Sequence, residues 1–474
     1  MESVTPWQRA GIALGAILAL YLVYSHLQYF GDISFLGAIL LLEVIIVCLW
    51  KYEQRFLVLL VVSFAWAGMN VPLQGAWTAG RWVVLTAGAA VGFVVWTTHS
   101  RRPFGLLHLI AFFCISAALV SATISSFFQM ASFKALSLLL LFLYCATGAR
   151  LAVLGRQERF VRGLLWGVEI AVYGTALCYF GLGASIWGNP NSLGAAMSTG
   201  AFPILLWGWL NADTPIMKGR RLIALLLCMY LVRFSMARAA IASVALVSVI
   251  FCVCLHQYKL LVKTMVLLLA VIAISGMWAP DALNTQLQDL EDAFLYKGHR
   301  QEGVLGSRRA PWDSSIASIK AHPWFGTGYG TSPTGEDPGY GPGKFASSAE
   351  EEREHGSSYI TIAEWVGLLG MMPFAALLGL TVSNVWKVCA WMRRTADPRH
   401  YSIPLAMVVI SGLAHASFED WLFAVGSYLS VLFWISAFIL PDLLPDAAIV
   451  PAFERHPRAS HPMPVGFGAT ESHR

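Results

Sequence analysis

Long apolar runs follow one another along almost the whole of this 474-residue chain. An α-helix needs about 20 apolar residues to cross the hydrocarbon core of a bilayer, and most of the runs approach that length. We expect helices over 10–30, 33–50, 55–73, 82–97, 106–125, 132–149, 160–182, 191–210, 221–237, 238–255, 261–279, 358–386, 403–419 and 421–440. Only 12% of the residues are charged, which excludes an ordinary soluble domain. The sequence predicts an all-α polytopic membrane protein with about 12–14 transmembrane helices.

Positive charge alternates between the successive loops of this predicted bundle. Lysine and arginine mark the cytoplasmic loops of bacterial membrane proteins, and every second loop carries them while the loops between are nearly bare. The basic residues are Lys51 and Arg55; Arg101 and Arg102; Arg150, Arg156, Arg159 and Arg162; Lys218, Arg220 and Arg221; Lys259 and Lys263; and Lys387, Arg393, Arg394 and Arg399. The pattern predicts a multi-pass membrane protein with a cytoplasmic N-terminus, and it places 280–357 outside, on the periplasmic side of the inner membrane if the source is a Gram-negative bacterium.

The same parity divides the chain into four parts. We expect an N-terminal transmembrane bundle over 1–279, a large periplasmic loop over 280–357, C-terminal transmembrane helices over 358–440 and a disordered cytoplasmic tail over 441–474. Because the basic residues lie in short loops and form no stripe, nucleic acid is not an expected partner. The eight cysteines lie in or beside apolar runs, so no disulfide framework and no metal site are predicted.

His355 stands just before the predicted helix that begins at residue 358, followed by Tyr359 and Glu364. An imidazole can take a proton from a hydroxyl group near neutral pH, a role that few other side chains fill. A helix-capping or solvated histidine is the alternative. His355 is therefore a candidate general base at the outer face, where an ionisable side chain is costly without a function.

Four arginines lie at the same predicted face. Arg308 and Arg309 are adjacent in the long loop and could hold a diphosphate through paired hydrogen bonds, or could be a surface pair. Arg233 and Arg238 flank a helix junction level with the membrane surface, where an arginine either reaches a lipid phosphate or extends to water. The glycine-rich stretch 326–330 indicates a tight turn more than a phosphate cradle.

Two further clusters border the predicted outer ends of helices. Asn189 and Asn191 are typical of a turn and a helix N-cap. His415 and Glu419 are four residues apart and are expected to share a helix face, as a structural pair or as part of an acceptor pocket.

These clusters, in this order over about 190–370, resemble the O-antigen ligase superfamily, which also contains Wzy-type polysaccharide polymerases and bacterial protein O-oligosaccharyltransferases. The matching segments are Asn189-Pro190-Asn191, Ser235 to Arg238, Arg308 to Trp312, Pro323 to Gly328, and His355 to Gly367. Two positions depart from the family pattern. Gly356 stands where the family often has asparagine, and two residues separate Ser235 from Arg238.

The resemblance implies a membrane glycosyltransferase fold of the C type, a donor glycan on undecaprenyl diphosphate, and neither metal nor cofactor. It implies that Arg238 and Arg308, with Arg309 and Arg233 as further candidates, bind the diphosphate, and that His355 activates the acceptor hydroxyl. Asn191, Tyr359, Glu364 and His415 are the candidate substrate-binding residues.

The acceptor stays open at this point. A ligase acting on lipid A-core is favoured, and a polymerase of O-antigen or exopolysaccharide acting on a growing chain is the alternative. Protein O-glycosylation and non-enzymatic transport of a lipid-linked sugar are further alternatives. Transport is disfavoured because the chain has no evident internal repeat.

Overall fold

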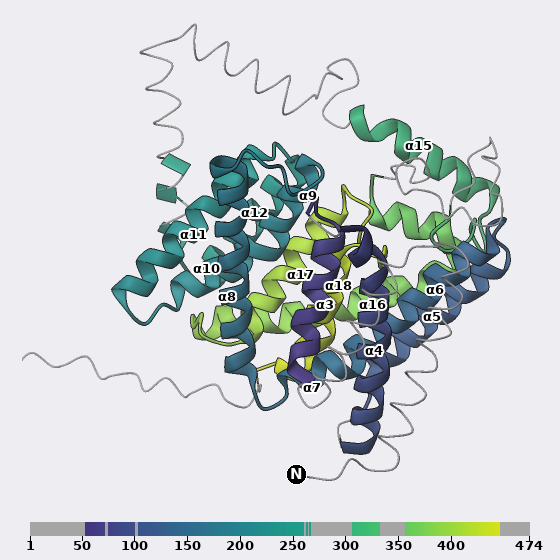
Figure 1. The fold of residues 1–474 in the computed structure, drawn as a ribbon, viewed down its shortest axis with the longest axis horizontal. Coiled ribbons are helices and arrows are strands. Elements are labelled where there is room, and N and C mark those ends of the chain that lie inside the picture. The colour runs from purple at the N-terminus through teal and green to yellow at the C-terminus, as the bar shows by residue number, and fades with distance from the viewer. Residues whose placement is uncertain are drawn as a thin grey trace, which may run out of the picture.

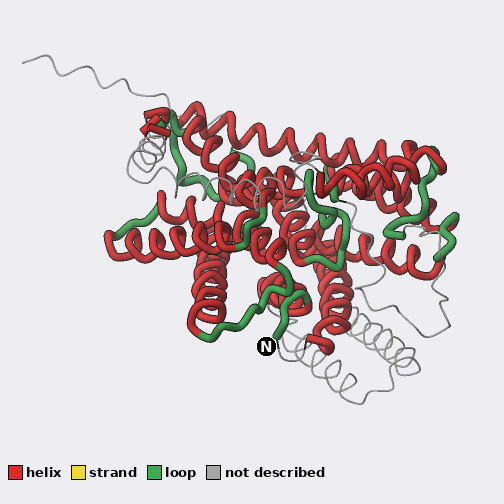
Figure 2. The backbone as a smooth tube through the Cα atoms, turned by 90° about the horizontal axis from the view of Figure 1, so that it is seen from above, coloured by secondary structure: helices red, strands yellow, loops and turns green. Residues whose placement is uncertain are grey.

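The computed structural model describes residues 53–71, 74–99, 103–259, 262–263, 265–266, 306–331 and 356–445, and every regular element in these ranges is a helix (Figure 2). Six described helical segments are long and apolar enough to cross a membrane, namely Trp77–Thr98, Leu106–Thr123, Phe128–Val153, Gln157–Gly181, Pro190–Leu210 and Ser358–Thr395. Four shorter apolar helices accompany them, Phe56–Ala67, Arg238–Cys254, Ser402–Ala416 and Tyr428–Leu443. The protein is a multi-pass membrane protein of the all-α class, as the sequence predicts.

The described elements follow the predicted order. The α-helices are α3 (Glu53–Ala67), α4 (Gln74–His99), α5 (Leu106–Thr123), α6 (Phe128–Tyr144), α7 (Arg150–Val153), α8 (Gln157–Ala176), α9 (Pro190–Ala195), α10 (Phe202–Leu210), α11 (Pro215–Phe234), α12 (Arg238–Cys254), α15 (Gly306–Ala321), α16 (Ser358–Thr395), α17 (Ser402–Ala416) and α18 (Tyr428–Ile439). Three π-helical turns extend them, η1 (Cys145–Ala149), η2 (Leu177–Gly181) and η3 (Ala196–Ala201), and a 3₁₀ turn, η6 (Leu440–Leu443), ends the described chain.

The number of spans differs from the expected 12–14 for three reasons. Helix α11, which covers the predicted span 221–237, is not among the candidate crossings. The four shorter helices do not reach the length of a full crossing by themselves. The predicted spans 10–30 and 33–50 and most of 261–279 lie outside the described residues, as do most of the long loop 280–357 and most of the tail 441–474. Within 280–357, the described part contains helix α15.

The helices form two groups around a shared centre (Figure 1). Helices α8, α10, α11 and α12 lie on one side, α4, α5 and α6 on the other, and α3, α17 and α18 between them. Helix α12 packs on α17, α5 packs on α16, and α15 packs on α16. The centre is filled by aromatic side chains of α6 and α18, including Phe142, Phe433 and Trp434, whose rings meet at centroid distances of 5.0 Å.

Loops that the sequence places on the same side of the membrane contact one another. On the expected cytoplasmic side, Arg150 pairs with Asp442, Asn211 Nδ2 donates to the Pro398 carbonyl at 3.0 Å, and His256 Nε2 lies 2.7 Å from the Arg393 carbonyl. At the other end, Arg81 Nη1 donates to the Gly426 carbonyl at 2.8 Å. The structure therefore groups the helix ends as the alternation of positive charge requires.

Glycine brings α4 into backbone contact with the end of α6. Gly88 and Gly92 lie one turn apart on α4 and face Tyr144 and Gly148. A Cβ atom at Gly92 would lie 2.7 Å from the Gly148 nitrogen, so no larger residue fits without movement of a backbone. Small residues that let helix backbones approach are characteristic of association within membranes.

Helix α16 is interrupted near its start, where the single span 358–386 was expected to be continuous. Gly367 has a φ of 67° and a ψ of −179°, which breaks the helical hydrogen-bond ladder. The loop Pro323–Gly330 supplies the missing partners: Leu368 N donates to the Pro323 carbonyl at 2.8 Å, and Thr327 N donates to the Glu364 carbonyl at 2.9 Å. The expectation of one unbroken helix is thus wrong, because the adjoining loop takes over these backbone bonds.

Close contact as well as conformation requires glycine at position 367. A Cβ atom there would lie 2.4 Å from the Trp324 carbonyl carbon. We expect Gly367→Ala to lower the free energy of unfolding by about 2–5 kcal/mol, since alanine pays for a left-handed φ and also overlaps the loop. Thermal unfolding of the purified protein in detergent measures this loss.

Gly379 in the same helix is the matched control, because a Cβ atom there meets nothing within 4 Å. Gly379→Ala should change the unfolding free energy by no more than about 1 kcal/mol. Equal unfolding midpoints for the two variants would contradict the structural role assigned to Gly367.

Candidate functional site

Helix α15 places Arg308 in a buried ion pair with Glu419. Arg308 Nη2 lies 2.7 Å from Glu419 Oε1, and the two side chains are only 10% and 20% exposed. Glu419 belongs to the loop that follows α17, and its backbone carbonyl accepts hydrogen bonds from Ser358 N at 2.9 Å and from Ser358 Oγ at 2.7 Å. Glu419 therefore joins α15 to the start of α16.

Arg238 is the first residue of α12 and is half-buried. Its charge is within electrostatic range of that of Arg308, so the two predicted diphosphate ligands lie in the same region of the bundle. The turn before α12 contains Met236, a non-glycine residue with a φ of 52°, and Ser235, whose Oγ accepts from Ala237 N at 3.3 Å. This turn separates α11 from α12 and fixes the position of Arg238 at the start of α12.

Arg233 and Arg309 are placed differently from these two. Arg233 is exposed on the last turn of α11, and its Nη1 contacts Met236 Sδ. Arg309 follows Arg308 on a helix, so its side chain points elsewhere, is 72% exposed and approaches Asp313 at 4.0 Å. Adjacent helical residues project about 100° apart, so Arg308 and Arg309 do not converge in this structure.

The Asn189–Asn191 segment packs directly against the turn that precedes Arg238. Asn189 Oδ1 accepts from Ser192 N at 2.7 Å and caps α9, the role the sequence predicts for this segment. Asn191 lies half-buried in the first turn of α9. A Cβ atom at Gly194 would lie 2.6 Å from Ser235 Oγ, which shows how closely α9 approaches the turn.

A pocket of about 340 Å³ opens between these two segments, at the C-terminal end of α11. Its lining combines apolar and small polar side chains from η2, α9 and the end of α11: Tyr179, Gly183, Ala184, Ser185, Pro190, Leu193, Phe234 and Ser235. Because Ser235 also belongs to the turn before α12, the pocket adjoins the start of the helix that carries Arg238.

Gly356 brings the segment before α16 against Arg308. It has a φ of 72°, and a Cβ atom there would lie 3.1 Å from Arg308 Cδ and 3.2 Å from Trp312 Nε1. A side chain of asparagine size would meet both residues, which gives a physical reason for glycine at this departure from the family pattern. His355, the preceding residue in the chain, lies outside the described residues.

The other candidate substrate-binding residues are buried or half-buried. Tyr359 is half-buried and its hydroxyl donates to the Leu413 carbonyl at 2.8 Å. Glu364 is fully buried within α16. His415 is buried at the end of α17, where its Nδ1 accepts from Trp421 Nε1 at 3.0 Å.

The expected helical pairing of His415 with Glu419 does not occur. Helix α17 ends at Ala416, so Glu419 lies beyond it and its carboxylate accepts from Arg308 instead. This partnership was not predicted, because 111 residues separate Arg308 from Glu419 in the sequence. A buried arginine in a membrane protein requires an acidic partner, and that rule alone could have directed attention to Glu419 or Asp420.

Tyr329 is a second residue that the sequence did not single out. It is buried in the turn 326–330, and its hydroxyl donates to the Phe423 carbonyl at 2.9 Å. Burial raises the pKa of Tyr329 well above its usual range, so the hydroxyl keeps its proton and remains a donor. Tyr329 thus anchors the turn to the same loop that carries Glu419.

The fold and these arginines define a multi-pass helical membrane protein with a cationic site at one end of the bundle. Residues 223–375 match the Wzy_C family model, whose description is O-Antigen ligase. Over these residues the chain is similar to the O-antigen ligase family, and the resemblance predicted from the motifs is confirmed there. No curated protein matches the chain significantly. The matched region includes Arg233, Arg238 and Arg308, whereas Asn191 and His415 lie outside it.

A double-mutant cycle tests the energetic role of the buried pair. We expect Arg308→Ala and Glu419→Ala to show a coupling energy of about 1.5–3 kcal/mol, because each leaves a buried charged partner without its ion. Thermal unfolding in detergent of the native protein, both single variants and the double variant gives this value. The exposed pair Arg309 and Asp313 is the control cycle, in which no measurable coupling is expected. Similar coupling in both cycles would contradict the assignment.

Proposed function

We propose that the protein is a glycosyltransferase that moves a glycan from undecaprenyl diphosphate to an acceptor hydroxyl at the periplasmic face of the inner membrane. The match of residues 223–375 to the O-antigen ligase family supports this class. The observation that supports the assignment is the approach of Gly356 to Arg308, with Arg238 within electrostatic range of the same guanidinium group, since it brings together three family-like motifs that are far apart in the sequence.

In the proposed reaction the acceptor oxygen attacks the anomeric carbon of the donor sugar. His355 takes the proton of the acceptor hydroxyl as the new C–O bond forms. The bond between the anomeric carbon and the diphosphate oxygen breaks, and the electron pair leaves with the diphosphate. Arg238 and Arg308 stabilise the charge that develops on this leaving group. No covalent enzyme intermediate is required.

The neighbourhood of Arg308 suits this role physically. Two like charges that lie near each other repel, and a diphosphate between them replaces repulsion by attraction. Glu419 holds Arg308 in place through 2.7 Å contact with one guanidinium nitrogen. The pocket beside Ser235, with Phe234 and Leu193 in its lining, would accept an apolar part of the lipid donor close to Arg238.

A purified assay tests the proposed base. With undecaprenyl-diphosphate-linked oligosaccharide and an acceptor present, His355→Ala should reduce product formation by at least about 100-fold, the usual contribution of a general base. His322 is exposed near the end of α15 and provides the matched control, so His322→Ala should retain normal transfer. Mass analysis of the product is the readout. Normal transfer by His355→Ala would remove His355 from the mechanism.

The side of the membrane is tested by labelling. Arg309 is exposed on α15, and Arg394 is exposed in the last turn of α16. In cells with a permeabilised outer membrane, Arg309→Cys should react with a membrane-impermeant maleimide, whereas Arg394→Cys should react only after the inner membrane is opened. The reverse pattern would place the site in the cytoplasm and exclude a periplasmic transferase.

We propose lipid A-core as the acceptor, which makes the protein an O-antigen ligase. The alternative is a polymerase of O-antigen or exopolysaccharide. The lipopolysaccharide of a deletion strain distinguishes them: a core without glycan indicates a ligase, and a core with one repeat indicates an O-antigen polymerase. Loss of secreted polysaccharide with intact lipopolysaccharide would indicate an exopolysaccharide polymerase.

A further inference from the structure

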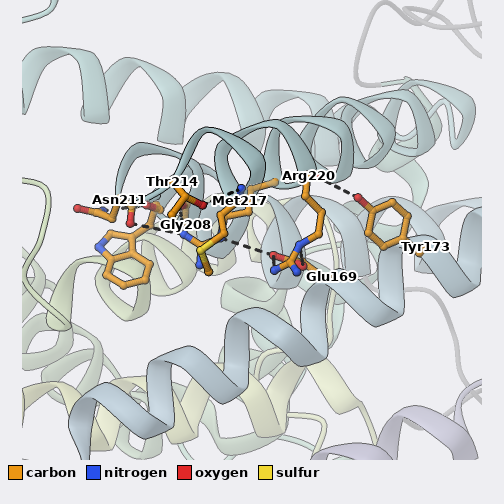
Figure 3. A network of polar contacts seen from close by, with 9 residues as sticks. Glu169, Tyr173, Gly208, Asn211, Thr214, Met217 and Arg220 are labelled. Atoms are coloured by element: carbon orange, nitrogen blue, oxygen red, sulfur yellow. Dashed lines mark hydrogen bonds and ion pairs between the residues drawn. The ribbon is translucent and has the colours of Figure 1, made fainter.

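A buried carboxylate lies between two arginines at the far end of α11 from Ser235. Glu169 of α8 is 3% exposed, and its Oε2 lies 3.0 Å from Arg220 Nε (Figure 3). Its Oε1 lies 3.7 Å from the Nε of Arg221, the next residue of α11. Asp213 also acts on the charge of Arg221, so the two carboxylates balance the two guanidinium groups, and the excess of positive charge at these ends of α8 and α11 lies on the exposed residues Arg159, Arg162 and Lys218.

The protein itself holds one of these arginines and leaves the other at the surface. Arg221 is buried, and its Nη1 donates to the Gly208 carbonyl at 2.7 Å. Arg220 has 36% of its side chain exposed, and the Tyr173 hydroxyl donates to its backbone carbonyl at 2.9 Å (Figure 3). Arg220 therefore carries its guanidinium group to the outside of the bundle.

The surface around Arg220 has the composition of a membrane interface. The Arg220 guanidinium carbon lies 4.5 Å from the centre of the Trp166 ring, and this tryptophan is 49% exposed. Arg162 lies one helical turn before Trp166 on α8 and is 66% exposed. Beyond them Ile170 and Ile223 are exposed apolar side chains on the same two helices. Tryptophan and arginine beside exposed aliphatic residues mark the level of lipid head groups.

We propose that the α8–α11 basic face, formed by Arg162, Trp166 and Arg220, binds the phosphate head group of an anionic phospholipid. Basic pockets between transmembrane helices on the cytoplasmic side are suited to such lipids. Guanidinium groups donate paired hydrogen bonds to phosphate oxygens, and the side chains of Arg162 and Arg220 both reach the surface, where a lipid head group can meet them. The acyl chains would lie along the exposed isoleucines. This site is separate from the Arg308 site and does not depend on the proposed function.

Native mass spectrometry of the purified full-length protein, with added phosphatidylglycerol or phosphatidylcholine, tests the proposal. We expect preferential retention of phosphatidylglycerol and an about fivefold loss of retention in Arg220→Gln, the equivalent of about 1 kcal/mol for one arginine near an anionic lipid. Arg220→Lys keeps the charge and should retain more lipid than Arg220→Gln. Arg394→Gln removes an exposed basic residue from the end of α16 and should change nothing.

Arg162→Gln tests the proposal if Arg220→Gln does not fold, because Arg162 pairs with the exposed Glu158 and lies outside the buried cluster. It should lower retention of phosphatidylglycerol and leave the unfolding midpoint unchanged. Equal retention of the two lipids, or unchanged retention in both glutamine variants, would overturn the proposal. Displacement of the lipid by millimolar inorganic phosphate would also overturn it, since the face would then be a simple anion site.

Discussion

The described structure depends on an exchange of backbone hydrogen bonds between the broken turn of α16 and the loop Pro323–Gly330. A break in a helix exposes polar backbone groups, and within a membrane each unpaired group costs several kcal/mol. The loop satisfies four of them, through Leu368 N, Leu369 N, and the carbonyls of Glu364 and Trp365. Helix α6 holds the loop, since Lys134 Nζ donates to the Gly330 carbonyl at 2.6 Å. Helix α5 holds the broken turn of α16, since Ser121 Oγ donates to the Trp365 carbonyl at 2.5 Å. The position of α15, and with it Arg308, follows from this contact.

Charged side chains inside the bundle are paired across elements that are distant in sequence. Arg150 bonds Asp442 with Nε and Nη2, and its guanidinium also lies 4.3 Å from the centre of the Trp96 ring. Arg308 likewise forms an ion pair with Glu419, which is distant from it in the sequence. Because a buried ion without its partner is strongly unfavourable, each pair fixes which helix ends lie together. Each end of the bundle is thereby held together by its own ion pair. Arg150 and Asp442 form the pair near η6, and Arg308 and Glu419 form the pair near the start of α16.

Hydropathy predicted most of the fold because the period and length of apolar segments are local properties. The segments 106–125, 160–182 and 191–210 correspond closely to described helices, and the junction between 221–237 and 238–255 lies where the structure has its turn. Hydropathy did not predict the interruption at Gly367, since the backbone hydrogen bonds lost there are replaced by bonds to a loop more than thirty residues earlier in the sequence. Similarly, Arg308 and Arg238 were identified as candidates from their motifs, but the carboxylate of Glu419 was not, because it reaches Arg308 only after α17 has ended. His355 remains a prediction from its motif.

The contact of Gly88 and Gly92 with Tyr144 and Gly148 has a consequence for how the bundle assembles. Lipid chains solvate an apolar helix as well as a neighbouring leucine does, so water exclusion does not drive two inserted helices together. They associate because their surfaces are complementary in shape. Here the glycines of α4 leave a flat surface, and the backbone at Gly148, just after α6, packs against it. The two helices are therefore suited to recognise each other after each has inserted independently. The specificity of that step comes from the glycine positions, which have no side chain to keep the backbones apart.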